Sequence, residues 1–366
     1  MSDDAVLRKN RQLKTLVDLS ALVNSTLDTR EIRKRAIEAA TTLADAETGS
    51  LLLVDRETGD LFFEVALGEK GNILQAMRLA RGQGIAGWVA ERGEPLIVND
   101  AGTDPRFFRG ADEKSSFTTK NMVCVPLKSK GKVIGVLQAV NKRSGLFDEE
   151  DSEGLSALAN QIAVAIENAG LYQELKEAFY GTAHALAETI EKRDPYTGGH
   201  TYRVMEYSLA IGKMMDLPDE ETENLKLAAI LHDIGKIGIR DSILLKNGRL
   251  DREEVRTMNL HAEYGAEILR HVKQLDKVIP GVRAHHERFD GNGYPDRLKG
   301  SGIPMIARII AVADTFDAMT TDRPYRKALT VSEAVGELRK NSGTQFDGEI
   351  VETFVRYFSG TGQYAA

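Results

Sequence analysis

One uninterrupted helical pattern, from about Glu149 to Lys192, most constrains the fold of this 366-residue chain. Apolar residues recur there at alternating spacings of three and four, as in a coiled-coil seam: Leu155, Leu158, Ile162, Ala165, Ala169 and Tyr172. The stripe then shifts through Leu175, Phe179, Leu186 and Ile190, and no proline interrupts it before Pro195. The sequence therefore predicts a long helix that couples two domains across a dimer. The plainer alternative is a helix that packs on its own domain.

Strand-like segments precede this helix and indicate a first domain of mixed structure. An amphipathic helix over about residues 5–27 comes first, and Asp28 and Thr29 are good caps for the helix that follows. The expected strands, separated by turn-forming residues, are 50–55, 61–67, 95–99, 122–127 and 132–141. Helices that flank an antiparallel sheet predict an α+β domain. We place an N-terminal helix at 1–28 and this domain at 29–165.

Helical periodicity dominates from about residue 175 onward, so the second domain is expected to be all-α. The expected helices are 199–215, 219–232, 251–271 and 330–341. Asp251 with Glu254, and Thr330 with Glu333, have the spacing of capping boxes. The predicted fold is thus an α+β domain, a linking helix at 149–192 and a helical bundle at 175–366.

The composition indicates a protein of the reducing cytoplasm. Cys124 is the single cysteine, which excludes an internal disulfide, and its apolar neighbours favour a buried side chain. The net charge of -7 argues against a protein that coats DNA or RNA. No apolar run approaches the ~20 residues of a membrane span, and the acidic N-terminus lacks a secretory pattern. We therefore expect a cytoplasmic protein whose partners include neither a nucleic-acid polymer nor a membrane.

The first domain resembles the GAF family of small sensor domains over about residues 29–165. The resemblance rests on residues 82–89, 125–127 and 133–137, and on Asn141-Lys142 followed by Phe147 and Asp151. In the branch that binds cyclic nucleotides, this last pattern ends in Asp-Glu, whereas Ser152 follows Asp151 here. The resemblance implies a regulatory domain. A filled core with a scaffold role is the alternative to a nucleotide pocket.

Imidazoles and carboxylates in the second half indicate a metal site. One block contains, in order, His285, His286, Glu287, Asp290, Gly293, Tyr294 and Pro295. His232-Asp233 ends an apolar helix, and Asp314 follows another apolar run. A buried ion pair at such a helix end is costly unless a metal or a partner compensates it. Because histidines and carboxylates bind divalent metals, these separated residues predict one site assembled in space.

Residues from about 190 to 350 resemble the HD-GYP family of cyclic dinucleotide phosphodiesterases, a branch of the HD metal-phosphohydrolase superfamily. The matching segments are 193–200, 232–236, His261, 285–295, 303–304, 307–309, 314–318 and 323–328. The resemblance implies one metal held by His200, His232, Asp233 and Asp314, and a second held by Asp233, His261, His285 and His286. It also implies hydrolysis of cyclic di-GMP to pGpG, with further cleavage to GMP left open and with Asp233 and Lys236 as catalytic residues.

The resemblance also implies substrate-binding residues and a metal count. Lys236 is expected to stabilise phosphate charge, and Arg323 and Arg326 to bind phosphate or guanine edges. Tyr196 occupies the position of a glutamate that helps to bind a third metal in some members, so two metals are expected. Imidazole ligands and family precedent favour iron, with manganese as the alternative.

Further residues are expected to support the site. Glu287, Asp290 and Asp317 are placed to orient the ligands. Gly293, Tyr294 and Pro295 are expected to shape a loop, which in the family is also tied to partners such as GGDEF-domain proteins.

Other functions stay open at the level of sequence. A site that binds metal and ligand with little turnover would make the chain a cyclic dinucleotide receptor, although no metal ligand is missing. Some HD-type di-iron proteins are oxygenases, but the Gly-Tyr-Pro block and the basic residues favour hydrolysis. Other cyclic dinucleotides, such as cyclic GMP-AMP, also stay open as substrates. We expect a homodimer through the N-terminal and linking helices.

Overall fold

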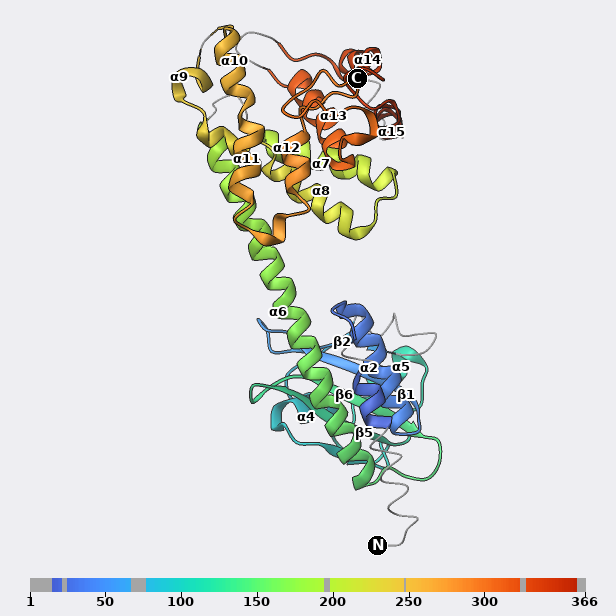
Figure 1. The fold of residues 1–366 in the computed structure, drawn as a ribbon. Helices are drawn as coiled ribbons and strands as arrows, with labels where there is room; N and C mark the ends of the chain where they lie inside the picture. Colours follow the sequence, from blue (N-terminus) through green and yellow to red (C-terminus); the bar gives the residue numbers. More distant parts are fainter. Residues whose placement is uncertain are drawn as a thin grey trace. The chain divides into compact units, whose positions relative to one another are not determined.

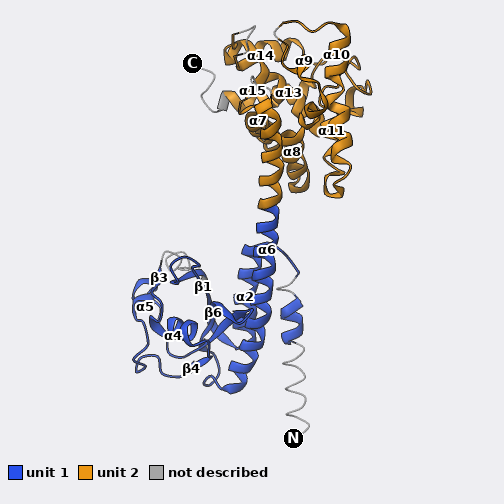
Figure 2. Cartoon of the chain, turned by 90° about the vertical axis from the view of Figure 1, so that its left-hand side faces the viewer, with its two compact units in different colours: residues 1–176 blue, residues 177–366 orange. Residues whose placement is uncertain are grey.

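The structure, a computed structural model, describes residues 15–21, 25–66, 77–193, 198–246, 248–322 and 327–360. It divides into two compact units, Met1–Lys176 and Glu177–Ala366 (Figure 2). Residues 15–21 are helical, and the rest of the expected helix before residue 25 lies outside the described residues. Tyr196, Arg323 and Arg326 also lie outside them.

The first unit is built on a six-stranded antiparallel sheet (Figure 1). The strands are β1 (Ala46–Val54), β2 (Leu61–Ala66), β3 (Arg78–Leu79), β4 (Leu96–Val98), β5 (Met122–Ser129) and β6 (Lys132–Lys142), in the order β3-β2-β1-β6-β5-β4. Successive side chains of a strand point to opposite faces. Leu51 and Leu53 accordingly join one buried cluster, and Leu52 joins another. Both faces of the sheet are therefore covered.

Helices supply the cover on each face. α2 (Thr29–Leu43) and the first part of α6 (Glu149–Arg193) share one apolar cluster with the sheet, and α4 (Gly84–Arg92) shares the other. Asp28 caps α2, because its side chain accepts hydrogen bonds from the backbone of residues 30 and 31. A short helix, α5 (Gly110–Ser115), precedes β5. The expected α+β domain is confirmed.

The linking helix is continuous, but its apolar seam differs in role from the prediction. The expected coiled-coil residues Leu155, Leu158, Ile162, Ala165 and Ala169 are at most 4% exposed and form the core of the first unit. Burial against the sheet removes them from any interface between chains, so the plainer alternative holds for this part of α6. The large apolar residues of α6 that are exposed are Val164, Leu171, Tyr172, Leu175 and Leu186.

Cys124 lies in the core between β4 and β6. The side chain is fully buried and pairs only weakly with the Gln138 amide, which lies 3.5 Å from its sulfur. Burial raises the pKa of the thiol to about 12. The thiol is therefore neutral and unreactive at physiological pH, as its apolar neighbours predict.

The second unit is a helical bundle, as expected. Its helices are α7 (His200–Met214), α8 (Asp219–Leu231), η1 (Ile234–Gly238), α9 (Asp241–Leu244), α10 (Arg252–Asn259), α11 (His261–Leu269), η2 (Lys273–Leu275), α12 (Ile279–Ala284), η3 (Gly300–Gly302), α13 (Met305–Thr320), α14 (Val331–Lys340) and α15 (Gly348–Gly360). Aromatic side chains fill its core, where the rings of Phe316 and Phe354 lie 5.0 Å apart. Within the described residues, no helix combines the length and apolarity needed to cross a membrane.

Local signals in the sequence set several helix ends. Both predicted capping boxes, at Asp251 and at Thr330, are confirmed. The single helix expected over 251–271 is wrong, because the chain breaks at Leu260 and His261 starts a new helix. The break leaves the last carbonyls of α10 unpaired within the helix, and the His261 side chain binds one of them.

Candidate metal centre

Helix ends carry the histidines of the site. His200 is the first residue of α7 and His261 the first of α11, whereas His232 and His285 follow the last residues of α8 and α12. Three of the rings are fixed in the same way, since Nδ1 donates to a backbone carbonyl three residues earlier. The acceptors are Ala229 (2.7 Å), Met258 (2.7 Å) and Val282 (2.6 Å), each in the last turn of a helix.

This shared contact fixes the tautomer of each ring. A carbonyl oxygen only accepts, so Nδ1 must carry the proton and Nε2 is left with a lone pair. The carbonyls would otherwise be unpaired groups at a helix C-terminus. Sequence analysis does not find these contacts, although the position of each histidine just beyond an apolar helix or at a helix break is a usable signal.

The lone pairs converge in two places. The Nε2 atoms of His261 and His285 lie 3.3 Å apart, and so do those of His200 and His232. A neutral pair of such rings has no proton to share, because both rings donate from Nδ1 elsewhere. Two facing acceptors in a buried site need a donor or a cation between them. This donor set fits a metal ion, and two groups have suitable spacing: His200 with His232 and Asp233, and His261 with His285 and His286.

Asp233 lies between the two imidazole clusters. Its Oδ2 is 3.5 Å from His232 Nε2 and 3.8 Å from His200 Nε2, and its Oδ1 is 3.5 Å from His261 Nε2. Asp314, on α13, approaches His200 Nε2 to 3.4 Å. One oxygen of Asp233 therefore faces each cluster, as a bridging carboxylate would.

The electrostatics keep the cluster of His261, His285 and His286 neutral. Burial, followed by repulsion from neighbouring imidazoles, lowers the pKa of His285 well below its usual value and that of His286 to about 3. Burial also lowers the pKa of His261. Burial opposes ionisation of Asp233, but Lys236 and the surrounding imidazoles outweigh it and hold the carboxyl pKa well below the usual range. Neutral imidazoles around an ionised carboxylate are the protonation states that metal binding needs.

A buried carboxylate orients His200. Asp317, only 1% exposed, accepts from His200 Nδ1 at 2.7 Å and from Arg203 Nε at 2.5 Å. Burial lowers the pKa of His200, but the Asp317 hydrogen bond and the nearby carboxylates outweigh it and raise that pKa. Arg203 is a functional residue that the sequence alone does not reveal. Its signal is the spacing from His200, because residues three apart share one face of a helix.

The glycine-rich loop packs directly on His286. Glu287, which is buried, accepts from the backbone N–H groups of Asp296 (2.6 Å) and Leu298 (3.1 Å) rather than from an imidazole. A Cβ at Gly293 would lie 2.3 Å from the backbone nitrogen of Arg288. The close approach places the Tyr294 ring 5.0 Å from that of His286. Asp290 binds the Arg288 guanidinium and its own turn, so it also shapes the loop.

A close backbone contact joins η1, which follows His232 and Asp233, to α11, which begins at His261. A Cβ at Gly235 in η1 would lie 1.9 Å from the carbonyl oxygen of His261 and 2.4 Å from the nitrogen of Gly265. Only glycine permits this approach. The contact sets the distance between Asp233, which precedes η1, and His261.

Lys236 reaches into the centre from η1. Its ammonium nitrogen lies 2.7 Å from Asp233 Oδ2, the oxygen that faces His200 and His232. The remaining described histidines lie elsewhere: His184 lines a cavity at the end of α6, and His271 lines a separate surface depression with Tyr264.

Comparison with known proteins identifies both halves. An HD domain model matches residues 184–350, and a GAF domain model matches residues 26–167. The 3'3'-cGAMP-specific phosphodiesterase 2 of Vibrio cholerae is 38% identical over 214 residues, which are 58% of this chain and 41% of that protein. The cyclic di-GMP phosphodiesterase response regulator RpfG of Xanthomonas campestris is 40% identical over 185 residues, 50% of this chain and 49% of that protein.

The chain thus spans about half the length, or less, of these curated relatives. Among solved structures, the GAF domain of a phosphoenolpyruvate-protein phosphotransferase from Coxiella burnetii is 24% identical, with a TM-score of 0.42 over 44% of this chain and 96% of that chain. The predicted order of domains is confirmed: the chain carries a GAF domain followed by an HD domain.

Proposed function

We propose that this chain is a metal-dependent phosphodiesterase that hydrolyses cyclic di-GMP to pGpG under the control of its GAF domain. The observation that carries the proposal is the pair of imidazole clusters on either side of Asp233. The relatives support the reaction, since both are named as cyclic dinucleotide phosphodiesterases.

The proposed site holds two divalent metals. His200, His232, Asp233 and Asp314 would hold one, and Asp233, His261, His285 and His286 the other. Metal pairs of this kind supply an activated water at neutral pH and neutralise charge on a phosphodiester. Five imidazoles favour a transition metal over magnesium or calcium, and we propose iron, with manganese as the alternative.

The chain's own residues position the substrate in this proposal. Lys236, which pairs with Asp233 at 2.7 Å, would contact a phosphate oxygen when metals balance the charge of that carboxylate. Burial and the Asp233 and Asp314 carboxylates raise the pKa of Tyr294, so its hydroxyl stays neutral and can donate a hydrogen bond to a bound substrate. Arg323 and Arg326 stay proposed ligands for phosphate or guanine.

Product analysis of the full chain tests the function. The protein is loaded anaerobically with Fe²⁺ or Mn²⁺ and mixed with cyclic di-GMP or 3'3'-cGAMP, and pGpG and GMP are followed by chromatography. We expect pGpG from cyclic di-GMP at a higher kcat/KM than any product from 3'3'-cGAMP. Tight retention of intact cyclic di-GMP without product would refute hydrolysis, and preference for 3'3'-cGAMP would refute the substrate.

A matched pair of variants links turnover to the site. His261→Ala should lower kcat/KM more than about 100-fold, because residues that only orient a metal ligand already contribute 10–100-fold. His271→Ala removes an imidazole from the separate surface depression and should leave turnover unchanged. Equal activities for the two variants would contradict the proposed ligands.

We further propose the cellular setting. A reducing cytoplasm suits a chain whose single cysteine is buried. The exposed apolar residues of α6 support a homodimer through the N-terminal and linking helices. The net charge of -7 is the reason that we propose no nucleic-acid polymer as a partner. The loop around Tyr294 is the proposed contact for GGDEF-domain proteins.

A further inference from the structure

The last turn of α6 contacts two segments beside the cluster of His200, His232 and Asp233. Glu191 reaches the start of α7, where His200 lies, and Arg193 reaches η1, which follows Asp233 and contains Lys236. Ala187 and Ile190 anchor the same turn in the core of the second unit. The helix that runs in from the first unit therefore ends on the site itself.

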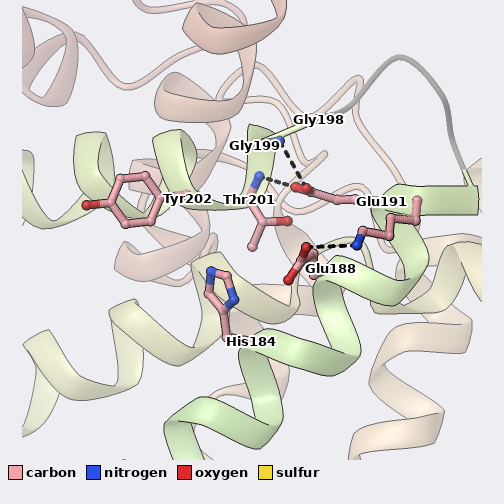
Figure 3. A pocket seen from close by; sticks show the side chains of 8 residues that line it. His184, Glu188, Glu191, Gly198, Gly199, Thr201 and Tyr202 are labelled. Carbon is pink, nitrogen blue, oxygen red and sulfur yellow. Dashed lines mark hydrogen bonds and ion pairs between the residues drawn. The ribbon is translucent and has the colours of Figure 1, made fainter.

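Glu191 replaces a missing cap on α7. The residue before this helix, Gly199, has no side chain to accept from the free N–H groups of the first turn. Figure 3 shows the Glu191 carboxylate in that role: Oε2 accepts from the Gly199 N–H at 3.2 Å, and Oε1 accepts from the Thr201 N–H. A carboxylate is also favoured at the positive end of the helix dipole. These two bonds bracket His200.

Arg193 holds the other segment. Its guanidinium donates to the backbone carbonyls of Lys236 (3.2 Å), Ile237 (2.9 Å) and Ile239 (2.8 Å). It also binds the Asp241 carboxylate at 2.7 Å, so donors on every nitrogen are used. Because these carbonyls belong to η1 and the residue after it, Arg193 fixes the backbone from which Lys236 extends to Asp233.

The two contacts act in different directions. Residues two apart on an α-helix point about 200° from each other, given 3.6 residues per turn. Glu191 therefore contacts α7 while Arg193 contacts η1, so one helix end positions the segments that carry His200 and Lys236. We propose that Glu191 and Arg193 are positioning residues that couple the end of α6 to the metal centre. This inference rests on the two-metal site of the proposed function.

Metal binding to the full chain tests the coupling without reference to turnover. Mn²⁺ is titrated by calorimetry into the wild type, and His200→Ala and His261→Ala assign the two binding steps. We expect Glu191→Ala to weaken the His200 step about 10–100-fold, as for other groups that orient a ligand, and to leave the His261 step within twofold. Arg193→Ala should lower kcat/KM about 10-fold, because it acts through Lys236, which the proposed function places on a phosphate oxygen of the substrate.

Glu188→Gln is the matched control. Glu188 lies one turn earlier on α6 and lines the same cavity of about 420 Å³, but its ion pair is with Lys192 on its own helix (3.3 Å). Both steps should keep wild-type affinity in this variant. Three results would each overturn the inference. In Glu191→Ala, the Mn²⁺ affinity of the His200 step could stay unchanged, or both steps could weaken equally. In Glu188→Gln, the His200 step could lose as much affinity as in Glu191→Ala.

A second variant covers the case in which Glu191→Ala does not fold. Glu191→Gln keeps the shape and one acceptor, so it should weaken the His200 step less, by about 2–10-fold. Wild-type affinity in Glu191→Gln would then overturn the inference. Failure of the proposed function looks different: the wild type would bind Mn²⁺ in two steps but release no pGpG, and the metal titrations would still decide the role of Glu191.

Discussion

Asp317→Asn isolates the contribution of an orienting carboxylate to the metal centre. Asparagine has nearly the same shape but offers one oxygen and one NH₂ group. If the NH₂ group faces His200, the ring must accept at Nδ1 and carry its proton on Nε2, the atom that faces His232. If the oxygen faces His200, the NH₂ group meets the Arg203 Nε donor instead. Either orientation loses one charge-assisted hydrogen bond.

The size of the effect follows from that one bond. A hydrogen bond to a charged group contributes about 1.5–3 kcal/mol, and about 1.4 kcal/mol corresponds to a tenfold change in affinity. We therefore expect Mn²⁺ affinity at the His200 cluster to fall about 10–100-fold, with little change at the His261 cluster. The unfolding free energy of the second unit should fall by about 2 kcal/mol, since Asp317 is buried and Arg203 keeps some access to water.

Asp347→Asn is the control, because Asp347 is also a buried carboxylate paired with an arginine, Arg308, but touches no imidazole. It should lower the melting temperature to a similar extent and leave both Mn²⁺ affinities unchanged. Calorimetric titration and thermal unfolding measure the two effects separately. Wild-type metal affinity in Asp317→Asn, or the same loss of affinity in Asp347→Asn, would refute the reasoning.

Three other changes probe separate parts of the molecule. Cys124 should react with a thiol reagent at pH 8 only after unfolding, because a pKa of about 12 leaves about 10⁻⁴ of it as thiolate. Rapid labelling of the native chain would contradict this burial. Because the thiol of the unfolded chain ionises at a lower pH than that of the folded chain, the unfolding free energy should fall as pH rises above about 9. Gly293→Ala forces the loop away from Arg288 and should lower kcat/KM for pGpG release. Gly302→Ala is the control, because nothing lies within 4 Å of the added carbon, and it should leave kcat/KM unchanged. Equal activities of the two variants would be evidence against a role of the loop in turnover. Leu171→Glu with Leu175→Glu places charges on residues 48% and 69% exposed and should halve the mass measured by light scattering, and an unchanged mass would count against the α6 dimer.

The sequence predicts elements best where a periodic pattern is long and its ends are marked. The 45-residue helix α6 was expected within one residue of its observed end, because no proline interrupts it and Asp194-Pro195 follows. β3 was not expected, since two residues are too few to show an alternation. The break at Leu260 was also not expected, because the apolar pattern continues through it and the cause, a side chain bonded to the backbone, is tertiary.

The seam of α6 shows why a pattern alone does not name its partner. The same spacing of apolar residues serves a second helix or a sheet, and here the sheet of the first unit takes Leu155, Leu158 and Ile162. At the metal centre, residue types and order indicated which side chains gather around Asp233. Contacts that depend on backbone position, such as those of Glu287 with the loop and of Arg193 with η1, have no residue pattern that precedes the fold.

The backbone contact at Gly235 has a consequence for mutational tolerance. An imidazole ligand has chemical substitutes, because aspartate or glutamate also binds divalent metals. A residue whose first side-chain carbon would overlap a carbonyl oxygen at 1.9 Å has none. In a saturation library scored for metal retention, Gly235 should therefore accept fewer amino acids than any of the metal-ligand positions, although it binds no metal itself.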